Sequence, residues 1–74
     1  MEKELFITKF ADALEMNSSE LTLDTEFRKL SHWDSLAYLS VIAMLDEEFD
    51  IQIEQAKFKT LITIGDIFNE CLKK

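Results

Sequence analysis

Apolar side chains recur every three to four positions near the start of the chain, with charged residues between them. In residues 4–15 the apolar positions at this spacing are Phe6, Ile7, Phe10, Ala13 and Leu14. The pattern predicts an amphipathic helix of about three to four turns. We expect it to end near residues 16–20, where an asparagine and two serines favour hydrogen bonds to the neighbouring backbone over continued helix.

The long connection after this helix contains apolar residues spaced like anchors: Leu21, Leu23, Phe27 and Leu30. A connection of more than about twelve residues without structure is usually functional or disordered. Four apolar anchors argue against disorder, so we expect an extended segment held against a core.

A second, strongly apolar helix is predicted over residues 35–49. Asp34 or Ser35 stands at its N-terminal cap, and Ser31 with Asp34 forms the S-x-x-D pattern of a capping box. Residues 50–61 are too polar for a long element. They predict a short helical turn that carries Ile51, Ile53, Phe58 and Leu61.

The last predicted helix begins after Thr63. Asp66 lies three residues on, as in a capping box, and Lys73 and Lys74 suit a helix C-terminus. One glycine, no proline and no hairpin dipeptide disfavour an all-β fold. The prediction is an all-α fold with three long helices and one short helix. A chain of 74 residues has room for one domain, residues 1–74.

The second helix has two apolar faces when its residues are placed at about 100° per position. The stripe suited to the core holds Tyr38, Val41, Ile42, Leu45 and Phe49. Roughly opposite lie Leu36, Leu39 and Ala43, beside Ser40 and Glu47. One interpretation is a central helix covered on both sides. The other is an exposed docking strip rimmed by Asp46, Glu47 and Glu48.

Charge and composition narrow the classes of partner. The net charge of −7 makes nucleic acid and anionic membranes poor partners and favours basic protein surfaces. The lone cysteine, Cys71, forms no disulfide framework or metal-ligand spacing and is expected to be buried in the last helix. Charges interrupt the first ten residues, which predicts neither a signal peptide nor a membrane span, and hence a soluble, cytoplasmic protein.

Ser35 lacks the partners that would make it a catalytic nucleophile. The only histidine, His32, precedes it across a helix boundary and is expected to be a solvent-facing loop residue. The G-x-S-x-G elbow is absent, and a single glycine excludes glycine-rich phosphate loops. Residues 46–54 are acidic but lack the central glycine of a calcium loop. We expect no catalytic residue and no metal site. A hydroxyl at a helix N-terminus is instead well placed to receive a phosphate.

Three motifs together resemble those of the acyl carrier proteins. They are "LDTEFRKL" at 23–30, "DSL" at 34–36 leading to "LDEEF" at 45–49, and "TIGDI" at 63–67. The likeness covers essentially the whole chain. It implies a small four-helix bundle and a carrier that is not an enzyme. Ser35 would hold 4′-phosphopantetheine, delivered from coenzyme A by a phosphopantetheinyl transferase, and the arm would carry acyl or aminoacyl groups as thioesters.

The resemblance also implies roles for other residues. Asp34 would engage the transferase, and Leu36 would be the apolar contact after the serine. Glu47 and Glu48 would present charge to basic docking patches of acyl-loading and acyl-transfer enzymes, beside the apolar docking strip that includes Leu39 and Ala43. The core stripe of Tyr38, Val41, Ile42, Leu45 and Phe49 would border an acyl pocket. We expect a monomer.

Departures from the family pattern bear on the pathway. Carriers of housekeeping fatty acid synthesis usually have acids two and five residues after the modified serine, where this chain has Ala37 and Ser40. Trp33 is more typical of discrete carriers in polyketide, aminoacyl or surface-polysaccharide assembly, although it can equally be a loop anchor. Tyr38 favours a short or polar cargo. A specialised carrier is therefore preferred to a housekeeping carrier. An unmodified acidic interaction module is the alternative from another class.

Overall fold

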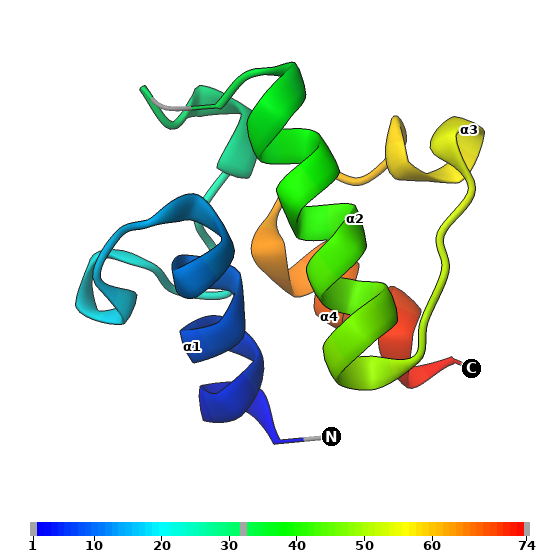
Figure 1. The fold of residues 1–74 in the computed structure, drawn as a ribbon, viewed down its shortest axis with the longest axis horizontal. Coiled ribbons are helices and arrows are strands. Elements are labelled where there is room, and N and C mark those ends of the chain that lie inside the picture. Colours follow the sequence, from blue (N-terminus) through cyan, green and yellow to red (C-terminus); the bar gives the residue numbers. More distant parts are fainter. Residues whose placement is uncertain (1, 32, 74) are drawn as a thin grey trace.

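The computed structural model describes residues 2–31 and 33–73, which form an all-α fold (Figure 1). Its helices are α1 (Lys3–Leu14), α2 (Ser35–Phe49), α3 (Gln55–Phe58) and α4 (Ile64–Leu72). Two short 3₁₀ helices, η1 (Ser18–Glu20) and η2 (Phe27–Lys29), lie between α1 and α2. The predicted three long helices, one short helix and long first connection are confirmed. His32 and Lys74 lie outside the described residues.

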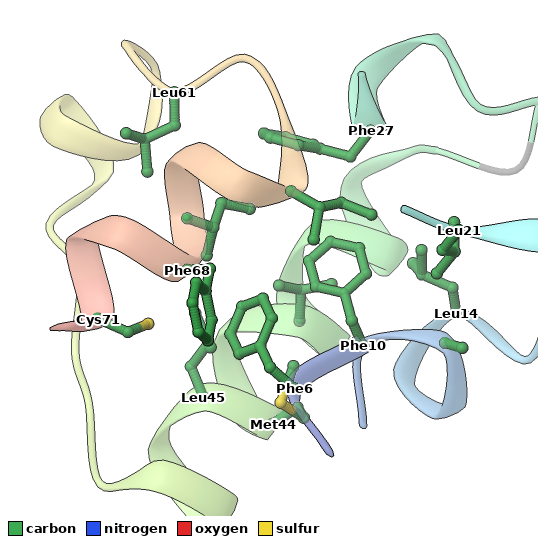
Figure 2. Close-up of a cluster of buried hydrophobic side chains, with 14 of the residues drawn as sticks. Phe6, Phe10, Leu14, Leu21, Phe27, Met44, Leu45, Leu61, Phe68 and Cys71 are labelled. Carbon is green, nitrogen blue, oxygen red and sulfur yellow. The ribbon is translucent and has the colours of Figure 1, made fainter. Parts of the chain in front are cut away.

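The core forms where α1, α2 and α4 meet (Figure 2). Phe6 of α1 lies at its centre, with its ring 5.2 Å from that of Phe68 and 5.7 Å from that of Phe49, centroid to centroid. The largest side chains that are almost completely buried are Phe6, Phe10, Phe27, Leu45, Ile64, Ile67 and Val41. Phe27 belongs to the connection, so that segment contributes to the same core.

The connection is ordered because it is attached to the start of α4. The Ile64 backbone N–H donates to Thr25 O at 2.9 Å, and the Gly65 N–H donates to Leu23 O at 2.7 Å. A Cβ atom on Gly65 would lie 2.8 Å from Leu23 O, so this close approach requires glycine. Of the predicted anchors, Leu21 and Phe27 are buried, and Leu23 and Leu30 are partly buried against the core.

The predicted cap of α4 is confirmed. Thr63 Oγ1 accepts a hydrogen bond from the Asp66 N–H at 3.1 Å, and Asp66 Oδ2 accepts from the Thr63 N–H at 3.0 Å. Asp66 Oδ2 also accepts from the Ile62 N–H at 2.9 Å. These backbone hydrogen bonds lower the pKa of the Asp66 carboxyl, because they stabilise its charged form.

Two local predictions are wrong. Asp34 is itself the N-cap of α2, with extended backbone angles, so the capping box that begins at Ser31 does not describe this helix. The Trp33 N–H donates to Leu30 O, so the chain is still in a turn before Asp34. Of the four apolar residues that the short helix was expected to carry, only Phe58 lies within α3; Ile51, Ile53 and Leu61 lie in the segments that flank it.

Candidate functional site

Asp34 and Ser35 form the start of α2, at the end of the molecule away from the start of α1 and the end of α4 (Figure 1). Asp34 Oδ1 accepts a hydrogen bond from the Ala37 N–H at 2.8 Å, and the Tyr38 N–H donates to Asp34 O at 3.0 Å. Asp34 thus performs the capping, and the neighbouring serine is not needed for it.

Ser35 is the first residue of α2 and is exposed. Within residues 2–31 and 33–73, its hydroxyl has no hydrogen-bond partner. The first N–H groups of a helix have no intrahelical acceptor and form a partial positive charge. The hydroxyl is therefore accessible, presented by a rigid element, and set beside helix N–H groups of which the Asp34 carboxylate already binds one.

Trp33 anchors the chain just before this site. Its ring stacks on Phe58 of α3, with 6.3 Å between centroids and 6° between planes, and lies 4.9 Å from the ring of Phe27. Tyr38 meets the same Phe58 edge-on at 5.0 Å. This aromatic group joins η2, the start of α2 and α3, and so fixes the position of Ser35.

A surface hollow of about 340 Å³ lies between the start of α2 and α3. Its lining residues are Arg28, Trp33, Asp34, Ser35, Tyr38, Gln55, Phe58 and Lys59. Aromatic rings provide an apolar wall, and Arg28 and Lys59 bring positive charge. An accessible hydroxyl, a helix N-terminus and two cations together fit a phosphodiester-linked group on Ser35.

Arg28 holds one side of this hollow in place. Its Nη2 donates to Phe58 O at 2.7 Å, its Nη1 donates to Leu61 O, and its guanidinium carbon lies 4.8 Å from the centroid of the Phe27 ring. Sequence reasoning missed Arg28, Gln55, Phe58 and Lys59 as site residues. A bond to a backbone carbonyl 30 residues away has no signature in a sequence.

The exposed face of α2 follows the two-faced pattern. Leu36 is 71% exposed and Leu39 is 59% exposed, and Ala43 is exposed on the same side. The interpretation in which both faces are covered is therefore wrong. Glu47 and Glu48 are also exposed, but Glu48 Oε1 pairs with Lys9 Nζ at 3.1 Å.

The opposite face of α2 divides into two depths. Val41 and Leu45 are buried in the core, together with Met44, whereas Tyr38, Ile42 and Phe49 are only partly buried. Met44 was absent from the predicted stripe. It is buried because α1 packs along this side of α2. Of the predicted pocket residues, Tyr38 borders the hollow beside Ser35.

Cys71 is buried in α4, and burial, with a contribution from Glu70, raises the pKa of its thiol to about 11. Among residues 2–31 and 33–73, no three histidine, cysteine or acidic side chains gather as metal ligands. In the same residues, no helix has the length and apolarity that crossing a bilayer requires.

Comparison with known proteins identifies the family. Residues 4–70 match the family model described as a phosphopantetheine attachment site. The acyl carrier protein of Exiguobacterium sibiricum is 35% identical over 57 residues, which cover 77% of this chain and 72% of that protein. The acyl carrier protein of Clostridium acetobutylicum is 30% identical over 59 residues, covering 80% and 77% of the two chains.

The chain therefore belongs to the acyl carrier protein family, whose members hold their cofactor at a phosphopantetheine attachment site. Its cofactor is 4′-phosphopantetheine, and it functions as a carrier rather than as an enzyme. This role requires a phosphopantetheinyl transferase and enzymes that load and unload the arm.

Proposed function

We propose that Ser35 is the residue that carries 4′-phosphopantetheine. A transferase would direct the Ser35 hydroxyl oxygen at the β-phosphorus of coenzyme A. The new P–O bond would form as adenosine 3′,5′-bisphosphate leaves and the hydroxyl proton passes to the solvent or a base of the transferase. The Ser35 hydroxyl carries this proposal, because it is exposed at the first position of α2 and has no hydrogen-bond partner among the described residues.

Transfer of phosphopantetheine tests this assignment. The chain is incubated with coenzyme A and a broad-specificity phosphopantetheinyl transferase, and the intact mass is measured beside that of Ser35→Ala. The wild type should gain one phosphopantetheinyl group, and Ser35→Ala should gain none. If both gain it, Ser35 is the wrong residue. If neither does, the assignment fails together with the carrier role of this chain.

The side of α2 that partners meet includes Asp34, Leu36, Leu39, Ala43, Glu47 and Glu48. Leu36 and Leu39 supply apolar contact area next to Ser35, and Glu47 supplies an exposed negative charge. Basic patches on loading and transfer enzymes would complement the net charge of −7. Glu48 contributes less, because Lys9 already neutralises it in part.

We further propose that the cargo is an acyl or aminoacyl group of a specialised pathway, held as a thioester on the arm. Ala37 and Ser40 stand where a housekeeping carrier usually has acids, so part of the acidic docking surface is missing. Housekeeping fatty acid synthesis is the alternative. Purified synthases and adenylating ligases of each class, offered with the modified carrier, distinguish the two by which enzyme loads the thiol.

The cargo pocket is proposed to be small. Tyr38 borders the hollow beside Ser35, and its ring is fixed against Phe58 at 5.0 Å. Val41, Ile42, Leu45 and Phe49 would border the space only after rearrangement of the core, which favours a short or polar cargo. The proposed carrier acts as a cytoplasmic monomer with one domain, residues 1–74.

A further inference from the structure

Some basic side chains of the molecule are paired with a carboxylate and others are not. Four lysines each lie within 4 Å of a carboxylate: Lys9 with Glu48 (3.1 Å), Lys29 with Glu26 (3.3 Å), and Lys57 and Lys73 with Glu70 (3.6 and 3.8 Å). Among the described residues, Arg28, Lys59 and Lys3 have no such partner. The chain has 15 acidic residues against 8 basic ones, so unpaired cations are not the default here.

Two of these three unpaired cations line the hollow that also includes Ser35. Lys59 is the C-terminal cap of α3 and is exposed. Arg28 is positioned by the carbonyl oxygens of Phe58 and Leu61 and by the Phe27 ring. A guanidinium has five N–H donors, so two such contacts leave donors and the full positive charge for a ligand.

We propose that Arg28 and Lys59 bind the phosphodiester of the arm, so that the arm rests over this hollow when the carrier is free. The inference rests on the proposed attachment at Ser35. The phosphodiester keeps one negative charge at neutral pH. The Asp34 carboxylate lines the same hollow and already accepts the Ala37 N–H at the start of α2, so the attraction comes mainly from the two cations. The aromatic wall formed by Trp33, Tyr38 and Phe58 covers the arm beyond the phosphate.

The strength of this contact suits a carrier. Exposed ion pairs contribute little and are screened by salt, so the resting position is easily left when a partner takes the arm. A carboxylate on the cargo could bind the same cations. The carrier with a free thiol distinguishes these two sources of negative charge, because the phosphodiester is then the only anion on the arm.

The test measures the motion of the arm in the modified, unloaded carrier. The arm is labelled with ¹⁵N at its two amides, and ¹⁵N relaxation and the ³¹P chemical shift are recorded at low and high salt. In the wild type we expect restricted amide motion that increases with salt. Lys59→Gln should lower the ratio of resting to free arm about two- to fivefold, the effect of losing one exposed ion pair.

Lys29→Gln is the matched control, because Lys29 lies on η2 next to Arg28 but already pairs with Glu26. It should leave the ³¹P shift and the relaxation unchanged. Arg28→Gln should release the arm further, and a thermal melt shows whether that variant stays folded. If Arg28→Gln does not stay folded, the comparison of Lys59→Gln with Lys29→Gln tests the inference.

Identical arm motion in the wild type, Lys59→Gln and Lys29→Gln, with no response to salt, would overturn this inference while attachment at Ser35 stands. The inference would also be overturned if Lys59→Gln releases the arm only when a carboxylate-bearing cargo is loaded, and not in the unloaded carrier. The cations would then be assigned to the cargo. Absence of any modification at Ser35 would overturn both proposals, and the intact mass reports that separately.

Discussion

The ring of Trp33 stacks on the ring of Phe58 at 6° between planes, which joins the residues just before Ser35 to α3. The contact makes the start of α2 a fixed platform rather than a flexible loop end. Phe58 is buried and also contacts Phe27 and Tyr38, so several elements share one anchor. The position of Ser35 therefore depends on side chains that lie outside the "DSL" motif.

Trp33→Ala should destabilise the fold by about 2 kcal/mol, less than for a fully buried tryptophan because Trp33 is only partly buried. It should also slow phosphopantetheinyl transfer at a temperature where the variant is folded. Urea unfolding and the transfer rate measure the two effects. Trp33→Phe keeps an aromatic contact, so its stability and transfer rate should lie between those of the wild type and Trp33→Ala. A Trp33→Ala variant with wild-type stability would mean that the stack contributes nothing.

Gly65→Ala should destabilise the fold by about 1–3 kcal/mol, because a new methyl group would press on Leu23 O at 2.8 Å. The connection would have to move away from α4 and lose the hydrogen bond from Gly65 N–H. Asn69→Ala on the exposed side of the same helix is the control and should be near neutral or slightly stabilising. Chemical denaturation compares them, and equal stability of Gly65→Ala and Asn69→Ala would contradict the close approach.

Local chemistry explains what the sequence predicted well. The Thr63 and Asp66 cap depends on residues three apart, and the apolar periodicities of α1 and α2 report their own helices. The Ser31 pattern misled because two overlapping capping patterns were possible there, and the turn that includes Trp33 decides between them. The burial of Met44 was missed because it depends on the packing of α1 against α2. The role of Arg28 was missed because it depends on two carbonyl oxygens about 30 residues away, which only the tertiary fold brings close.

Leu36→Asp and Val41→Asp should separate docking from folding. Leu36 is 71% exposed, so its replacement should leave stability nearly unchanged and lower kcat/KM for phosphopantetheinyl transfer about tenfold or more, as loss of a docking hot spot does. Val41 is fully buried, and an unpaired carboxylate there should unfold the chain. Circular dichroism and the transfer rate measure both. Unfolding by Leu36→Asp would show that Leu36 belongs to the core.

The α4 cap predicts a pH dependence of stability. Because the pKa of Asp66 is lower in the folded chain than its ordinary value, the carboxylate contributes stability above about pH 4. That contribution is lost as the pH falls through the lowered folded pKa. The difference in free energy of unfolding between the wild type and Asp66→Asn should therefore shrink over the acid interval below about pH 4. A difference that stays constant over this interval would contradict the assignment.

Locating the modification after transfer from coenzyme A tests the assignment of Ser35 most directly. Tryptic digestion yields a peptide from Leu30 to Lys57, which contains three serines, Ser31, Ser35 and Ser40. Fragmentation of the modified peptide assigns the added group to one of them. We predict that all of it lies on Ser35, and that Ser40→Ala is modified as fast as the wild type. Phosphopantetheine on Ser31 or Ser40, or on no serine of this peptide, would contradict attachment at Ser35.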